Sequence, residues 1–96
     1  MDASSVVAAL APIKPELASF GVKQLLLVGS VARGECKPDS DLDFVVEFVG
    51  PATFLTYMDL IELLEGALGR RVDLTTLKAL RPEIAATVLA EARRVA

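Results

Sequence analysis

The sequence predicts an α/β fold in which a short, mixed, three-stranded sheet is flanked by helices. Short apolar runs with the length of strands alternate along the chain with longer segments whose apolar residues recur at helical spacing. No linker, repeat or low-complexity tract separates these segments. We therefore expect residues 1–96 to form a single small domain around one core.

Two helices are expected near the N-terminus, over residues 3–11 and 15–20. Pro12 lies between them and is expected to break or bend the pair, because proline lacks the N–H that an inner helical turn needs. Pro15 suits the first turn of the second helix, and Gly21 suits the left-handed residue that ends it.

The first two strands are expected to follow these helices. Residues 24–28 form a short apolar run that ends at Gly29, which is typical of a strand covered on both faces. The polar residues 35–40 predict a turn, and residues 41–48 form the second strand, which ends before Gly50.

The second half of the chain predicts a helix over residues 52–68, a third strand over 70–75 and a final helix over 82–94. Gly69 is expected to end the first of these helices. The apolar stripe that we expect this helix to bury comprises Phe54, Met58, Ile61, Leu64 and Leu68. The final helix is expected to bury Ile84, Val88 and Leu89 and to carry Arg93 and Arg94 in its last turn.

Composition and charge exclude several classes of protein. Of the 96 residues, 53% are hydrophobic and 5% aromatic, which predicts an aliphatic core. The formal net charge of −3 argues against direct, sequence-independent binding of nucleic acid, which requires a basic face. No apolar run approaches about 18 residues, so no membrane span is expected. The single cysteine, Cys36, cannot form an internal disulfide, and no signal peptide is evident, so we expect a cytoplasmic protein.

A glycine–serine pair followed by two aspartates predicts a site for a metal ion and a phosphate. Side chains alternate along a strand, so Asp41 and Asp43 face the same way and can bind one Mg²⁺ together. Gly29 has no side chain and Ser30 has a small one, so a triphosphate can approach the backbone closely. Arg33 can neutralise part of the charge of that triphosphate.

Each of these residues also has a purely structural explanation. An isolated Asp-x-Asp is common on exposed strands, and Ser30 suits a helix N-cap as well as a phosphate site. Asp73, on the third predicted strand, and Arg33 are each compatible with an ordinary ion pair at the surface. Ser40 suits a residue that orients the turn before Asp41. The preceding Gly-Ser pair and the later acid favour the catalytic interpretation of the two aspartates.

These motifs resemble the minimal nucleotidyltransferases (MNT) of the polymerase-beta superfamily, whose pattern is Gly-Ser, then Ser-Asp-x-Asp, then an acid on a later strand. The matching positions are Gly29, Ser30, Ser40, Asp41, Asp43 and Asp73. Residues 32–34 match the Ala-Arg-Gly continuation of the family, and residues 78–84 resemble the ending of the MNT group. Val28 departs from the pattern, because many members carry an aromatic residue there. The resemblance implies a small polymerase-beta-like nucleotidyltransferase fold.

The same resemblance implies a Mg²⁺-dependent nucleotidyltransferase with ATP as its substrate. The residues that would catalyse the reaction and hold the metal, with two ions expected, are Asp41, Asp43 and Asp73. The residues that would bind the nucleotide are Gly29, Ser30, Arg33 and Ser40. A hydroxyl would attack the α-phosphorus and pyrophosphate would leave. Because the chain contains no histidine, a carboxylate or the metal must take up the proton.

By this resemblance the protein is the antitoxin of a HEPN/MNT toxin–antitoxin pair. It would transfer AMP from ATP to a tyrosine hydroxyl of a cognate HEPN ribonuclease toxin, and would also bind that toxin. Two other classes stay open: a small-molecule nucleotidyltransferase of the aminoglycoside type, and a stoichiometric toxin-binding antitoxin without catalysis. The sequence leaves open the base preference and whether the chain forms a homo-oligomer or a hetero-oligomer with the toxin.

Overall fold

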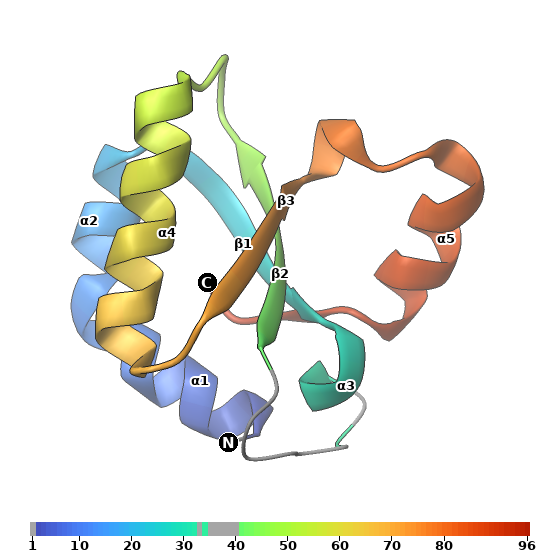
Figure 1. Ribbon diagram of the computed structural model, residues 1–96, viewed down its shortest axis with the longest axis horizontal. Helices are drawn as coiled ribbons and strands as arrows, with labels where there is room; N and C mark the ends of the chain where they lie inside the picture. The colour runs from blue at the N-terminus through green and yellow to red at the C-terminus, as the bar shows by residue number, and fades with distance from the viewer. Residues whose placement is uncertain (1, 33, 35–40) are drawn as a thin grey trace.

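The structure is a computed structural model that describes residues 2–32, 34 and 41–96. Helices and strands alternate along the chain, as the sequence predicts (Figure 1). In order, the elements are α1 (Ala3–Leu10), η1 (Ala11–Ile13), α2 (Lys14–Ser19), β1 (Val22–Val28), α3 (Gly29–Ala32), β2 (Leu42–Phe48), α4 (Phe54–Leu68), β3 (Val72–Thr76), η2 (Leu77–Ala79), α5 (Pro82–Glu91) and β4 (Arg93–Arg94).

The strands form one mixed sheet in the order β3-β2-β1-β4. β2 runs parallel to β3, whereas β1 pairs antiparallel with both β2 and β4. The predicted α/β class and the mixed sheet are confirmed, but among the described residues the sheet has four strands rather than three.

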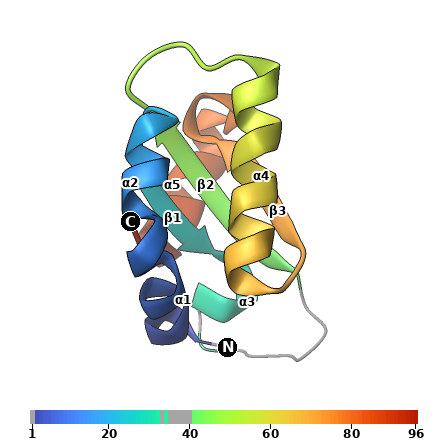
Figure 2. The ribbon, with the colours of Figure 1, turned by 90° about the vertical axis from the view of Figure 1, so that its left-hand side faces the viewer.

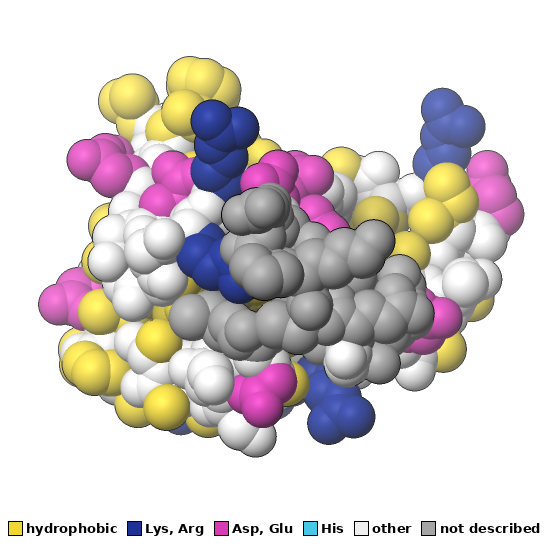
Figure 3. Space-filling model, turned by 60° about the horizontal axis from the view of Figure 1, so that its bottom comes forward, with side chains coloured by type: hydrophobic (Ala, Val, Ile, Leu, Met, Phe, Trp, Pro, Cys, Tyr) yellow, Lys and Arg dark blue, Asp and Glu magenta, His cyan; other side chains and the backbone are white. Residues whose placement is uncertain are grey.

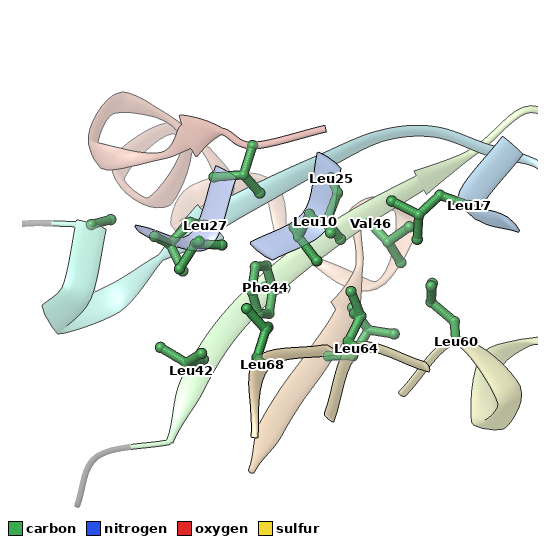
Figure 4. Close-up of a cluster of buried hydrophobic side chains, with 14 residues drawn as sticks. Leu10, Leu17, Leu25, Leu27, Leu42, Phe44, Val46, Leu60, Leu64 and Leu68 are labelled. Atoms are coloured by element: carbon green, nitrogen blue, oxygen red, sulfur yellow. The ribbon is translucent and has the colours of Figure 1, made fainter. Parts of the chain in front are cut away.

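Helices cover the two faces of the sheet unequally (Figures 1 and 2). α1, α2 and α4 lie together on one face, and α5 lies on the other (Figure 2). The core lies between the sheet and the first group of helices, where Leu10, Leu17, Leu60, Leu64 and Phe44 belong to one buried hydrophobic cluster (Figure 4). Since side chains alternate along β2, the residues on either side of Phe44 in this strand point toward the α5 side.

The buried stripe of α4 differs from the predicted one. Leu60, Leu64 and Leu68 are buried, whereas Phe54 is 74% exposed and Met58 is also exposed. Apolar residues lie on more than one side of this helix, so spacing alone allowed two stripes. Contacts with α1 and β3 decide between them. The helix begins at Phe54 rather than at residue 52, after Thr53, whose hydroxyl accepts a hydrogen bond from the N–H of Thr56.

The prediction for the C-terminal helix is also wrong in part. α5 ends at Glu91, and Arg93 and Arg94 form β4 instead of a last helical turn. The reason is the open edge of β1: the N–H of Val95 donates to the carbonyl of Leu25 at 2.9 Å, and Val95 is buried in the core. The unpaired groups of a strand edge favour such pairing.

α5 itself buries little. Ile84 and Leu89, which the sequence analysis placed in the core, are 47% and 40% exposed, and Val88 is half-buried. Within the part of the chain that the structure describes, α5 contacts mainly β1 and the short helix α3, and two of its apolar positions face outward.

Several predicted boundaries are confirmed and others shift. Pro12 lies in η1, between the two N-terminal helices, and Gly21 and Gly69 adopt φ values of +80° and +66° at the predicted stops. β3 begins at Val72 rather than at residue 70, and β2 begins at Leu42, so Asp41 precedes its strand. No helix within the described residues is long and apolar enough to cross a membrane.

Candidate active site

Two of the predicted carboxylates face each other across neighbouring strands. Asp43 of β2 and Asp73 of β3 are register partners in the parallel ladder. Their chain neighbours Leu42, Phe44 and Leu74 are buried in the core, so both aspartates lie on the opposite, α5-facing side of the sheet. The sequence predicted both residues, and the parallel pairing of β2 with β3 is what brings them together.

Asp41 lies two residues before Asp43, just outside the strand, and is exposed. The sequence analysis placed it on the second strand, facing the same way as Asp43, whereas β2 begins one residue later, at Leu42. Within residues 2–32, 34 and 41–96, no three Asp, Glu, His or Cys side chains converge into a group of the kind that holds a metal ion. The close pair is therefore Asp43 with Asp73, and Asp41 stands at its margin.

Gly29 closes one side of this pair. The preceding residue, Val28, is the antiparallel partner of Asp43, and Gly29 itself has φ +77°. A Cβ atom added at Gly29 would lie 2.5 Å from Oδ2 of Asp43. Glycine is thus required here for two reasons, a left-handed backbone and the close approach of a carboxylate.

Of the other predicted nucleotide-binding residues, the structure describes the position of Ser30 but not of Arg33 or Ser40. Ser30 lies within the four-residue helix α3, which begins at Gly29. It is therefore not the N-cap residue of that helix, contrary to the structural explanation of Ser30. Arg33 and Ser40 lie outside the described residues, as do Cys36 and the predicted turn at 35–40. Their roles stay predictions.

A cavity of about 290 Å³ opens over the aspartate pair. Its floor includes Asp43 and Asp73, and its far wall is built by Val88 and Glu91 of α5 together with Leu80. The sequence analysis did not single out Glu91. Its spacing of three residues from Val88 on one helix was a usable signal, because residues at i and i+3 share a face.

A second and larger cavity, about 340 Å³, lies at the other end of β2. It is lined by Phe48, Gly50, Pro51 and Lys78, and Glu47 is the one carboxylate on its wall. With no second acid beside Glu47, this cavity lacks the paired oxygen ligands that a divalent cation prefers. We therefore place the candidate active site in the smaller cavity.

The electrostatics of the site disfavour its ionised state. The pKa of Asp43 is raised above the ordinary value of 3.8, chiefly because burial penalises the charged carboxylate and further because Asp73 and Asp41 carry like charges nearby. A divalent cation would relieve this repulsion, and carboxylate oxygens are the ligands that Mg²⁺ binds in proteins. The donor set therefore fits Mg²⁺.

The surface around this end of the molecule carries both signs of charge. Figure 3 shows acidic and basic side chains side by side on this face, with no continuous basic surface on the part that the structure describes. Neither sign of charge therefore dominates the described part of this face.

Known proteins are similar to this chain in sequence and in fold. A relative from Thermococcus cleftensis, named protein adenylyltransferase MntA, is 46% identical over 72 residues, which are 75% of this chain and 73% of the relative. A solved structure described as that of a minimal nucleotidyltransferase is 39% identical with a TM-score of 0.84, covering 97% of this chain and 95% of that one.

A more distant structure extends the comparison of folds. It is a complex of a tri-AMPylated HEPN toxin from Shewanella oneidensis with an MNT antitoxin, 18% identical with a TM-score of 0.67, covering 95% of this chain and 71% of that one. At this identity the likeness concerns the fold alone. The model of the nucleotidyltransferase domain family matches residues 10–95, nearly the whole chain. Together with the fold, this match shows that the chain belongs to the nucleotidyltransferase domain family, as a minimal nucleotidyltransferase.

Proposed function

We propose that this chain is a Mg²⁺-dependent protein adenylyltransferase and the antitoxin of a HEPN/MNT pair. Its reaction moves AMP from ATP to a tyrosine hydroxyl of a cognate HEPN toxin in the cytoplasm. The observation that carries the proposal is the register pairing of Asp43 with Asp73 on the floor of a cavity, with Gly29 against Asp43. The name of the Thermococcus relative supports the type of reaction.

In this proposal the cavity floor binds the reacting phosphate. Asp43 and Asp73, with Asp41 beside them, hold Mg²⁺, which when bound neutralises charge on the triphosphate. The cleared space at Gly29 lets the phosphates approach the backbone, next to the first turn of α3. Ser30, Arg33 and Ser40 are proposed to complete the nucleotide contacts.

The proposed transfer breaks one bond and forms one. The hydroxyl oxygen of the acceptor bonds to the α-phosphorus, and the bond from that phosphorus to the bridging oxygen of the β-phosphate breaks, so pyrophosphate leaves with the electron pair. The acceptor proton passes to a carboxylate, because the chain has no histidine. We assign this role to Asp73, which is the more exposed of the paired aspartates.

A partner protein supplies the acceptor in this proposal. The Shewanella oneidensis complex contains an AMPylated HEPN toxin, and this chain shares the fold found in that complex. The cavity of about 290 Å³ over the carboxylates is proposed to hold the reacting phosphates, so the acceptor must be brought to it from outside. A tyrosine presented by a bound toxin would meet this need.

The proposal is tested by incubating the purified protein with MgCl₂, ATP labelled at the α-phosphate, and the co-purified HEPN partner. We expect label on the partner, and peptide mass spectrometry should locate AMP on tyrosine. Asp43→Asn and Asp73→Asn should each lower the transfer rate by at least about 100-fold, in the range seen when one electrostatic element of an active site is removed.

The matched control is Glu47→Gln, which removes a carboxylate from the same strand and the same face, four residues from Asp43, and should leave transfer within about twofold of the wild type. Label that appears only in small molecules would replace the proposal with the aminoglycoside-type alternative. Neutralisation of the toxin by Asp43→Asn at the same protein ratio as the wild type would show a stoichiometric antitoxin.

A further inference from the structure

Two side chains of α4 hold the outer edge of β3 on either side of Asp73. The hydroxyl of Tyr57 donates a hydrogen bond to the carbonyl of Leu74. The N–H of Val72 donates to Oε2 of Glu65 at 3.0 Å. Asp73 lies between the two anchored residues, so both bonds bracket one of the proposed metal ligands.

These bonds occupy positions that the sheet leaves open. β3 is an edge strand with β2 on one side, and the carbonyl of Arg71 accepts from the N–H of Leu42 at 3.0 Å. In a parallel ladder alternate residues bond to the same neighbour, so residues 71, 73 and 75 turn their backbone groups toward β2. Val72 and Leu74 therefore turn theirs outward, where α4 meets them.

The edge strand needs this support because of its charge. Asp73 is the register partner of Asp43 on the neighbouring strand, so the two carboxylates repel each other when both are ionised. An edge strand is bonded on one side only and is the easiest part of a sheet to separate. Repulsion across the β2–β3 pair therefore favours movement of β3 away from β2.

We propose that Tyr57 and Glu65 are positioning residues that keep Asp73 opposite Asp43 before a metal ion arrives. They touch neither substrate nor metal and act through the backbone of β3. The consequence is a preorganised pair of carboxylates, which lowers the cost of ordering the site when Mg²⁺ binds. This inference rests on the proposed function, since it takes the aspartate pair as the metal site.

The test measures Mn²⁺ binding by the electron paramagnetic resonance signal of the free ion, with no nucleotide or partner present. Tyr57→Phe keeps the ring and removes the hydroxyl, and Glu65→Ala removes the acceptor. Each should weaken Mn²⁺ binding by about threefold to tenfold, the range that one hydrogen bond supplies. Glu65→Gln keeps an acceptor oxygen and should restore affinity. Glu62→Ala, an exposed acid on the same helix, is the matched control and should change nothing.

The decisive comparison repeats Tyr57→Phe in an Asp73→Asn background. If Tyr57 acts through Asp73, the hydroxyl adds nothing once that carboxylate is gone, so Asp73→Asn alone and the double variant should bind Mn²⁺ equally. Amide hydrogen exchange of β3 without metal gives an independent readout and should be faster in Tyr57→Phe than in the wild type.

Two results would overturn the inference while leaving the metal site intact. One is a loss of thermal stability in Tyr57→Phe with unchanged Mn²⁺ affinity, and the other is an equal loss of affinity in both backgrounds. If the wild type and Asp73→Asn bind Mn²⁺ alike, the proposed metal site fails, and the inference fails with it.

Discussion

The two faces of β2 have opposite physical roles, although they come from the same seven residues. Leu42, Phe44 and Val46 point into the core and are almost completely buried. Asp43 alternates with them and lies in the cavity on the other face, where its charge is disfavoured. Burial of Phe44 and its neighbours on one face stabilises the fold. On the other face, the charge of Asp43 beside Asp73 destabilises it. Substitutions of Phe44 and of Asp43 should therefore change stability in opposite directions.

The largest effect is expected on the core face. Phe44→Ala should lower the free energy of unfolding by about 3–5 kcal/mol, because it removes a buried aromatic side chain and leaves a cavity. Phe54→Ala is the matched control, since Phe54 is 74% exposed, and should change it by less than about 0.5 kcal/mol. Urea denaturation followed by circular dichroism measures both. Equal losses would mean that α4 buries the stripe that the sequence analysis expected.

Gly29→Ala should have the next largest effect. Placing a side chain in the left-handed region costs about 1–2 kcal/mol, and the new Cβ would also displace the Asp43 carboxylate. Gly21→Ala separates the two causes, because Gly21 has φ +80° with nothing within 4 Å of an added Cβ. Thermal melts should show a similar loss of Tm from backbone strain in both variants. Mn²⁺ binding should weaken in Gly29→Ala alone, and equal binding by both variants would contradict a close contact at Asp43.

On the cavity face, a substitution of Asp43 should raise the free energy of unfolding instead of lowering it. Asp43→Asn removes a half-buried charge that burial and its acidic neighbours disfavour, so the metal-free protein should become more stable at neutral pH. Solvent screening limits the gain to about 1 kcal/mol, which would raise the Tm by no more than roughly 4–8 °C. Asp59→Asn, an exposed acid on α4, should leave the Tm unchanged. A lower Tm in Asp43→Asn would show that the carboxylate is stabilising.

The smallest expected effect is a dependence of the free energy of unfolding on pH through Asp43. Because the pKa of Asp43 is raised in the folded state, the folded protein keeps a proton that the unfolded chain has released. This carboxyl therefore lowers stability as pH rises from about 3.8 through its raised pKa. The stability of the wild type relative to Asp43→Asn, measured by urea denaturation, should fall across this range.

Asp2 provides an internal contrast to Asp43. The N–H of Ser5 donates to its carboxylate at 2.8 Å and lowers the pKa of Asp2, so its contribution is present above pH 3.8 and is lost as pH falls through the lowered pKa. The stability of the wild type relative to Asp2→Asn should therefore rise as pH rises through the lowered pKa of Asp2 toward 3.8, whereas that relative to Asp43→Asn should fall as pH rises from 3.8. Parallel curves for the two variants would contradict the different environments of these acids.

The local features of the candidate site were predictable because they depend on spacing along the chain. The period of two in a strand fixes Asp43 to the face opposite Leu42, whatever the rest of the fold does. Likewise, the stops at Gly21 and Gly69 follow from the left-handed conformation that glycine accepts. The order of α1, α2, β1, β2, α4, β3 and α5 is predictable for the same reason.

The misplaced elements depend on contacts between distant segments. Nothing near Arg93 predicts a strand, because its partner is Leu27, far away in the sequence. The choice between Phe54 and Leu60 as the buried position of α4 depends on where α1 and β3 lie. Glu91 enters the cavity because α5 packs across the sheet.

The sequence by itself determined which residues are candidates for the chemistry and which face of the strand Asp43 and Asp73 occupy, because both follow from residue type and from the repeat of the backbone. Only the tertiary structure decided which of them meet. Asp73 lies opposite Asp43 because β2 and β3 run parallel in one register, and the outer edge of β3 bonds to Tyr57 and Glu65 because α4 packs beside it. Pairings of this kind are set by packing over the whole chain, which short-range periodicity does not encode.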